Sequence, residues 1–299
     1  MLIGFGGPEK PEEVRPFLES VLRGVKIPQA RFEQVLRHYE VIGGVSPYNS
    51  ITYRQMKALE IELRKRGIPA PVFIGFRHAS PSLGDTLKRI QKAEINRVVG
   101  FVLSPLRSYA SFGKYVERVE EARKKSGAGR IEFIYTEPFH DNPLFIQAQS
   151  DEAAKIIQKL SPAEKNKTFF IFSAHSIPAA MAQAGGYDRQ FEVIATLIAR
   201  RAGISSWAVA YQSRSGNPKD PWLEPSVEGL IKGVDRSKYK NVALVPAGFL
   251  CDNAEVIYDL DYEIKNLCQS IGLSYVRAKT VTDHPQFIRL MADLVEAKL

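Results

Sequence analysis

The chain has 299 residues, 44% hydrophobic and 25% charged, which is the composition of an ordinary soluble globular protein of one large or two modest domains. Its net charge of +8 favours an anionic partner. The basic residues are scattered and no nucleic-acid-binding motif accompanies them, so a small anionic ligand fits better than nucleic acid. The apolar runs are too short to span a bilayer and no secretory leader opens the chain, which predicts a cytoplasmic protein without membrane insertion.

Eight short apolar runs alternate with amphipathic stretches of helical length. In chain order they lie at 2–6, 71–76, 97–103, 130–135, 168–174, 207–212, 242–248 and 274–278. This alternation is typical of parallel strands in βα units. Because four strands fall on each side of a break at 136–145, we predict an α/β protein of two doubly wound, Rossmann-like halves, each with a four-stranded parallel sheet.

The glycine-rich stretch GFGGPE at 4–9 follows the first predicted strand. It lacks the last glycine of a dinucleotide-binding loop, and no acidic residue ends a second strand at the required distance. A tight turn between a strand and a helix is the better interpretation.

Ligands of parallel α/β proteins bind beyond the carboxyl ends of the strands, and the cleft between two such sheets is the natural pocket. The segments that follow the predicted strands are therefore candidates for a site. Six of them carry chemically useful side chains: GGPEKPEE, RHASP, SPLRSYASFGKY, HSIP, SRSGNPKDPWLEP and FLCDNAEVIYDLD.

A row of carboxylates follows the seventh strand, at Asp252, Glu255, Asp259 and Glu263. At about 100° per residue of α-helix, all four share a face about 80° wide. Like charges four residues apart repel by about 0.2–0.5 kcal/mol per pair, and Lys265 lies too far around the helix to relieve them. This unfavourable row indicates a function.

His175 follows the fifth strand, so it is predicted at the same edge of the second sheet as the acidic helix. Taken alone, it reads as a hydrogen-bonded structural histidine. Beside carboxylates, an imidazole can bind a borderline divalent cation or accept protons near neutral pH. The set has too few His and Cys ligands for a closed zinc site, so we expect a weakly held or passing metal.

Arginines and aromatic residues also follow the predicted strands. The arginines can hold carboxylates of an anionic ligand, and the aromatic rings can line a flat pocket. Solvated arginines and aromatic side chains that only pack the loops are the alternative interpretations. The residues are Arg77, Arg107, Arg214, Tyr109, Phe112, Tyr115, Tyr211 and Trp222.

The whole sequence resembles the ferrochelatases, which insert Fe²⁺ into a porphyrin. The resemblance rests on FGGPEKPEEVRPFLESVLRG, HYEVIGGVSPYNSIT, FSAHSIP, YQSRSGNPKDPWLEP and VPAGFLCDNAEVIYDLDYE. It implies two Rossmann-like halves, which we place at 1–140 and 141–283. It also implies a C-terminal helix at 284–299 that packs back on the first half.

The resemblance also implies the site residues. His175 matches the family's catalytic histidine and Glu255 its glutamate, and the metal would be handled by His175, Glu255, Asp259 and Glu263. The pocket would bend the macrocycle while these residues move protons and metal. The porphyrin-binding residues would be Arg77, His78, Arg107, Ser108, Tyr109, Tyr115, Arg214 and Trp222.

Two positions depart from the family pattern. Asn253 stands where the family usually has a second histidine, and Glu9 stands where Bacillus-type members have a tyrosine. The actinobacterial type shares GGPE with this chain. Cys251 and Cys268 are the only cysteines, which excludes the four-thiolate [2Fe–2S] cluster of some relatives. We expect no tightly bound cofactor, with Fe²⁺ as a substrate.

Coproporphyrin III is the favoured ring. The stretch 23–44 is charged and amphipathic and lacks the apolar lip of membrane-associated members, and SPLRSYASFGKY and QSRSG resemble the actinobacterial, coproporphyrin-type enzymes. Haem-pathway enzymes would be its protein partners. The alternatives are protoporphyrin IX as the ring, a cobalt chelatase acting on sirohydrochlorin, and a tetrapyrrole- or haem-binding protein that has lost catalysis with its second histidine.

Overall fold

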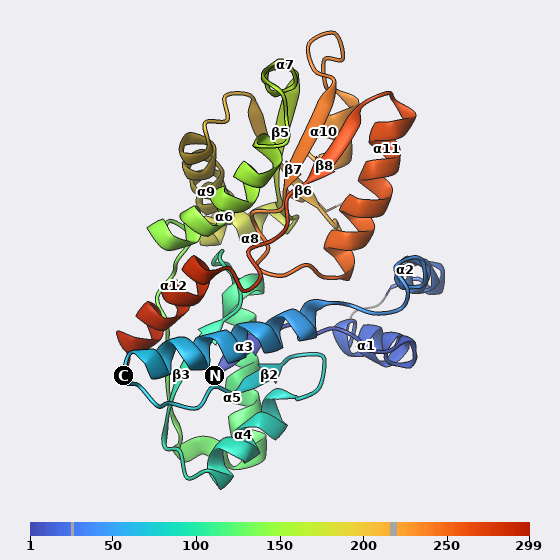
Figure 1. The fold of residues 1–299 in the computed structure, drawn as a ribbon. Helices are drawn as coiled ribbons and strands as arrows, with labels where there is room; N and C mark the ends of the chain where they lie inside the picture. The colour runs from blue at the N-terminus through green and yellow to red at the C-terminus, as the bar shows by residue number, and fades with distance from the viewer. Residues whose placement is uncertain (25–26, 216–219) are drawn as a thin grey trace. The chain divides into compact units, whose positions relative to one another are not determined.

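Eight strands form two four-stranded parallel sheets in the computed structural model, which describes residues 1–24, 27–215 and 220–299 (Figure 1). The strand order is β2-β1-β3-β4 in the first sheet and β6-β5-β7-β8 in the second. The strands are β1 Leu2–Gly4, β2 Ile74–Phe76, β3 Arg97–Val102, β4 Glu132–Tyr135, β5 Thr168–His175, β6 Trp207–Gln212, β7 Asn241–Val245 and β8 Ser274–Arg277. Each lies within or overlaps one predicted run, so the predicted α/β class is confirmed.

The chain divides into two units, of which the first contains Met1–Ser104, Tyr109–Pro138 and Thr282–Leu299. The second contains Pro105–Ser108 and Phe139–Val281. No helix in the described part of the chain is long and apolar enough to cross a membrane.

Among the described residues, the first unit also contains short 3-10 turns, one π-helical turn and six α-helices. They are η1 Pro11–Glu13, α1 Val14–Val21, α2 Gln29–Val41, α3 Tyr48–Lys65, α4 Leu83–Lys92, the π-helix η2 Tyr109–Gly113, α5 Lys114–Ser126, η3 Ala128–Arg130 and α12 Pro285–Glu296. Helix α4 shows why these segments are helical. Ser82 caps its first turn by accepting the N–H of Asp85 at 3.2 Å, and Leu87 and Ile90 are fully buried.

The turn after β1 needs its glycine. Gly6 has a φ of +88°, and a Cβ on it would lie 2.6 Å from the Cβ of Ala79. Only glycine combines that backbone conformation with so close an approach. This geometry supports the turn interpretation of GFGGPE.

Helix α12 lies along α3 in the first unit, although more than 200 residues separate them in the sequence (Figure 1). Phe287 of α12 is fully buried with its ring centroid 6.4 Å from that of Phe101 on β3. Arg66, at the end of α3, binds Asp293 at 2.6 Å and Glu296 at 3.0 Å. Apolar packing and this ion-pair network together hold the C-terminal helix.

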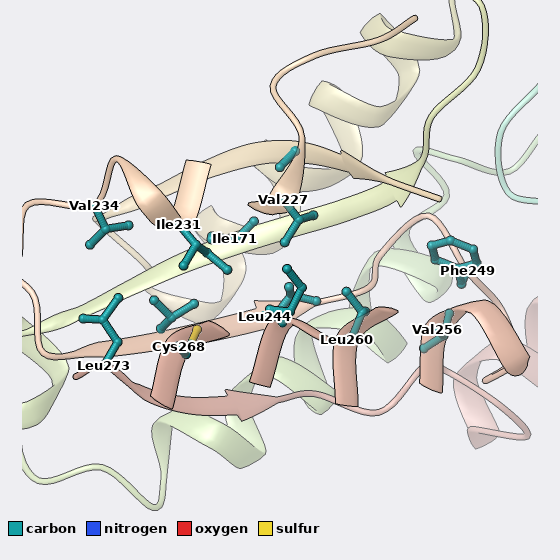
Figure 2. Packing of buried hydrophobic residues seen from close by; sticks show 13 residues of the cluster. Ile171, Val227, Ile231, Val234, Leu244, Phe249, Val256, Leu260, Cys268 and Leu273 are labelled. Atoms are coloured by element: carbon teal, nitrogen blue, oxygen red, sulfur yellow. The ribbon is translucent and has the colours of Figure 1, made fainter. Parts of the chain in front are cut away.

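The second sheet is surrounded by α6 Pro143–Ile157, α7 Pro162–Asn166, α8 Ala179–Gly185, α9 Tyr187–Ala202, α10 Val227–Lys232, the π-helix η4 Val256–Ile264 and α11 Lys265–Ser270. One apolar core joins η4 and α11 to the sheet (Figure 2). Val256, Leu260, Ile264 and Cys268 face it, against sheet residues such as Ile171 and Leu244. Burial of this stripe fixes which side of η4 is left for polar residues.

Candidate active site

His175 ends β5, and its two ring nitrogens have different surroundings. Nδ1 lies 2.5 Å from the carbonyl oxygen of Ser176, and Nε2 lies 3.5 Å from Oε2 of Glu255. Because a carbonyl oxygen can only accept a hydrogen bond, Nδ1 carries a hydrogen. Nε2 is therefore the nitrogen that can gain or lose a proton, and it points at a carboxylate.

Each member of the His175–Glu255 pair stabilises the charged form of the other. Burial lowers the pKa of His175, but the Glu255 carboxylate and the Ser176 carbonyl outweigh it, so the pKa lies above the usual range of histidine. Burial raises the pKa of Glu255, but His175 outweighs it and lowers that pKa overall. The side chains are 31% and 52% exposed, so water screens the pair and it contributes little to folding stability.

Asp259 lies four residues after Glu255 on the same helix. Burial raises its pKa, a hydrogen bond from the Ser213 hydroxyl lowers it, and Glu255 and Glu263 raise it, with a net pKa of about 7. This carboxyl can therefore hold or release a proton near neutral pH. A third titratable group thus lies beside the His175–Glu255 pair.

A buried polar network supports Asp259 from the end of β6. Ser173 donates to Oε1 of Gln212 at 2.9 Å, and Nε2 of Gln212 lies 3.5 Å from Oδ2 of Asp259. Ser213 adopts a φ of +58°, which is unusual for a residue other than glycine. Its strained backbone directs its hydroxyl at the same carboxylate, and such strain is often found at functional sites. Sequence reasoning missed all three residues that support Asp259.

The acidic helix differs from the predicted α-helix. Val256–Ile264 is π-helical, with i→i+5 hydrogen bonds and a wider turn. Glu255, Asp259 and Glu263 each precede by one position the buried Val256, Leu260 and Ile264. A spacing of four residues falls just short of one π-helical turn, so these three carboxylates still form a row next to the apolar stripe.

Asp252 is not part of that row, which corrects the prediction that four carboxylates share the face. It lies two residues before the helical backbone begins at Ala254, and it binds Arg277 of β8 at 3.1 Å. Arg277 also binds Asp261 at 2.6 Å. The expectation that no neighbouring cation relieves the carboxylate row is therefore wrong for Asp252, because its cation comes from another strand.

Within the described residues, no three His, Cys, Asp or Glu side chains are gathered closely enough to hold a metal ion. The metal set of His175, Glu255, Asp259 and Glu263 stays a prediction.

The Asn253 side chain has a structural role. Its Oδ1 accepts the backbone N–H of Val256 at 2.8 Å, so it caps the helix that carries Glu255. Glu9, the other departure from the family pattern, is exposed, and its backbone N–H donates to Glu13 at 2.8 Å.

Replacing Asn253 by alanine is expected to lower the free energy of unfolding by about 1 kcal/mol, because an N–H of the first turn loses its acceptor. Urea unfolding of the whole chain measures this loss. Asn142→Ala, which removes the cap of α6 on the N–H of Leu144, is the matched control and should show a similar loss. Asn253→Ser should restore stability, and an alanine variant as stable as the wild type would contradict the capping role.

The other predicted residues of the second unit lie in loops. The Arg107 backbone exchanges hydrogen bonds with the side chain of Gln190, and Ser108 is buried. Arg214 donates to the Asp220 carbonyl at 2.9 Å. Trp222 forms a β-bridge with Pro178, and its Nε1 is buried without a hydrogen-bond partner in the described chain. Residues 216–219 of the YQSRSGNPKDPWLEP motif lie outside the described residues.

In the first unit, the structure brings together Arg77, His78 and Tyr115. The Arg77 guanidinium lies over the Tyr115 ring, 4.6 Å from its centroid, and over Phe5 at 5.5 Å. Nδ1 of His78 is 3.1 Å from the Ser20 hydroxyl. Tyr109 is 50% exposed, and its hydroxyl donates to Glu117 rather than joining this group.

The charge around His78 is strongly positive. Burial and then the positive charges of Arg77, Arg118 and Arg23 lower its pKa to about 4, so this histidine is neutral. Nε of Arg77 is buried and has no hydrogen-bond partner among the described residues. The group is therefore suited to an anion. Sequence reasoning found Arg77 and His78 but did not name Arg23 or Arg118 as site residues, although Arg23 lies within the motif FGGPEKPEEVRPFLESVLRG.

A family model described as ferrochelatase matches residues 1–299. A coproporphyrin III ferrochelatase of Mycolicibacterium smegmatis is 37% identical over 302 residues, covering 100% of this chain and 89% of that protein. A coproporphyrin III ferrochelatase of Mycolicibacterium paratuberculosis is 39% identical, and the match covers 99% of this chain and 86% of that protein. A ferrochelatase of Rhodopirellula baltica is 35% identical, covering 100% and 85%.

Among solved structures, SirB from Bacillus subtilis with Fe³⁺ has a TM-score of 0.57 at 13% identity, covering 82% of this chain and 89% of that one. A cobalt complex of the sirohydrochlorin chelatase SirB from Bacillus subtilis subspecies spizizenii has a TM-score of 0.56 at 13% identity, covering 99% and 92%. At this identity the likeness concerns the fold alone. It agrees with the two parallel sheets described above.

Proposed function

The chain belongs to the ferrochelatase family, and from this we propose that it inserts Fe²⁺ into coproporphyrin III to form coprohaem in haem biosynthesis. The observation that carries the proposal is the His175–Glu255 pair at the edge of the second sheet, continued by Asp259 and Glu263. The names of the relatives at 37% and 39% identity support coproporphyrin III as the ring.

Metal insertion replaces two pyrrole N–H protons by one dication, so two protons must leave the macrocycle as the Fe–N bonds form. In our proposal, Nε2 of His175 first passes its proton to the carboxylate row. Nε2 and the Glu255 carboxylate then accept the two pyrrole protons, which leave along the same row. An arriving Fe²⁺ lowers the pKa of both groups by Coulomb repulsion of the proton, which favours proton release at that moment.

The carboxylates of Asp259 and Glu263 transfer those protons away from the ring and deliver the cation to it. Asp259 titrates near pH 7, so it exchanges protons without a large free-energy step. In our proposal, the carboxylate oxygens spaced along the helix bind the cation weakly, one after another. The proposed set of His175, Glu255, Asp259 and Glu263 thus acts as a relay.

The arginines support a substrate rich in carboxylates. In the first unit Arg23, Arg77 and Arg118 surround a neutral His78, and Nε of Arg77 can donate to a substrate oxygen. In the second unit, Arg107 and Arg214 are the proposed contacts. Coproporphyrin III has four propionates where protoporphyrin IX has two, so each extra carboxylate adds a possible charge-assisted hydrogen bond.

The aromatic and polar residues complete the proposed ring contacts. Tyr109, Tyr115 and Trp222 would pack on or beside the macrocycle, and Ser108 would donate a hydrogen bond. We propose no tightly bound cofactor, a cytoplasmic location, and haem-pathway enzymes as the protein partners that supply the ring and take the product.

The test is anaerobic Fe²⁺ insertion, followed by absorbance, with coproporphyrin III and protoporphyrin IX in parallel. We expect kcat/KM to be at least about tenfold higher for coproporphyrin III, since one or two charge-assisted hydrogen bonds correspond to about 1.5–3 kcal/mol each. A preference for protoporphyrin IX would keep the reaction and reject the ring. Tight binding of both rings without metallation would reject catalysis and favour a tetrapyrrole-binding protein.

A further inference from the structure

Arg277, the last residue of β8, uses its whole guanidinium inside the protein. Nε and Nη2 donate to the two oxygens of Asp261 at 2.7 and 2.6 Å. Nη1 and Nη2 donate to Asp252 at 3.1 and 3.3 Å, and Nη1 also donates to the Ala278 carbonyl at 3.0 Å. These bonds account for all five N–H donors of an arginine. With 11% of its side chain exposed, Arg277 has no donor left for a substrate.

The two carboxylates bracket the catalytic stretch. Asp252 precedes the helix and Asp261 lies inside its π-helical part, so Glu255 and Asp259 fall between the two attachment points. The strand that carries Arg277 is itself fixed, because Arg277 pairs with Leu244 of β7 in the sheet. The guanidinium therefore ties both points of the acidic helix to the sheet edge.

A π-helix of nine residues needs such support. Long π-helices are rare, because an α-helix is the better hydrogen-bonded state of most sequences. Between Val256 and Asp261, a return to α-helix would rotate the later residue by roughly a quarter of a turn, since π-helical turns contain close to one more residue. Asp261 would then leave the plane in which Arg277 binds it with two bonds.

We propose that Arg277 is a positioning residue that holds the 256–264 segment in its π-helical register and thereby keeps Glu255 and Asp259 beside His175. The register sets the direction of the whole carboxylate row, because all of its members lie on one continuous backbone. The structural part of this inference stands by itself, and its catalytic consequence rests on the proposed function.

The test compares Arg277→Met with Arg66→Met in the full-length chain. Arg66 binds Glu62, Asp293 and Glu296 in the first unit, so its loss also breaks an ion-pair network but leaves the acidic helix alone. Amide hydrogen exchange of peptides covering 254–264 and steady-state Fe²⁺ insertion are measured for both. Porphyrin affinity is measured by fluorescence titration.

In Arg277→Met we expect exchange at 254–264 to accelerate at least about tenfold, because local opening loses its main restraint. We expect kcat to fall about tenfold or more while porphyrin affinity changes less than about threefold, since the ring contacts are untouched. Arg66→Met should show neither change. Arg277→Lys should behave like Arg277→Met, because an ammonium cannot bind two carboxylates in a fixed fork.

Unchanged exchange at 254–264 in Arg277→Met would overturn the inference, as would faster exchange spread evenly over the second unit with kcat retained. If the Arg277 variants do not fold, Asp261→Ala removes two of the five bonds and is judged by the same measurements. If the wild-type protein inserts no iron, the proposed function fails, and the exchange experiment still decides whether Arg277 holds the register.

Discussion

Replacing His175 by alanine is expected to lower kcat for Fe²⁺ insertion about 10²- to 10⁴-fold, the usual effect of removing a group that moves protons in the rate-limiting step. Nε2 of His175 is the ring nitrogen that faces Glu255, and its Nδ1 contacts the Ser176 carbonyl oxygen. Porphyrin binding should stay within about threefold of the wild type, because the substitution removes proton chemistry rather than ring contacts.

His140→Ala is the matched control for His175→Ala. It makes the same substitution in the same unit, at a histidine to which we assign no part in the reaction. The two variants are compared by stopped-flow absorbance under anaerobic conditions. Full activity in His175→Ala, or an equal loss in both variants, would remove His175 from the mechanism.

Replacing Glu255 by glutamine should lower kcat by a similar factor, about 10²-fold or more. The amide keeps the shape of the side chain but removes its negative charge, so the dication and the leaving protons lose their first carboxylate. The variant should also lower the pKa of His175, because Glu255 is the main cause that raises it against burial. NMR titration of the His175 ring measures that shift independently of catalysis.

Glu228→Gln is the control for this charge change, since Glu228 pairs with Lys232 on the surface of α10. It should leave both kcat and the titration of His175 unaltered. If Glu255→Gln retains activity while the pKa of His175 falls, the glutamate only tunes the histidine. If activity falls with no change in that pKa, the ion pair of the structure is not the state present in solution.

The fold was predictable from the sequence because its signal is local. Buried parallel strands need apolar residues on both faces, so runs such as RVVGFV and TFFIF stand out from the helices between them. His175 and Glu255 could also be predicted as site residues from the sequence, since each follows a predicted strand and matches a family motif. The distance between the two side chains and their mutual effect on the pKa values could not be predicted, because both depend on how the segment after β7 is placed next to the end of β5.

The π-helix had a signal that we did not use. Val256, Leu260, Ile264 and Cys268 are spaced by four residues throughout, whereas the apolar stripe of an α-helix mixes steps of three and four. In an α-helix, the two steps of four from Val256 to Ile264 would carry the stripe about 80° around the axis. Reading the carboxylates at an α-helical period gave the correct row from Glu255 to Glu263 but wrongly added Asp252.

The partners that orient the site could not be found from the sequence. Arg277 reaches Asp252 from 25 positions away and Ser213 reaches Asp259 from 46. No motif links such residues. From the sequence alone, an arginine at the end of an edge strand would be predicted to lie in solvent. Only the fold brings them together, which is why the supporting contacts were missed although the residues that they contact were predicted.

The first unit is built from segments that are far apart in the sequence, and this determines when it can finish folding during synthesis. Its sheet and its other helices come from residues up to Pro138, but Phe101 is covered by Phe287 of α12, which belongs to residues 282–299. On the ribosome, the entire second unit is made before this cover exists, and domains generally fold as units while the chain emerges. The unit whose synthesis begins first is therefore completed only after the second unit has been made, and its apolar surface stays uncovered until residues 282–299 follow.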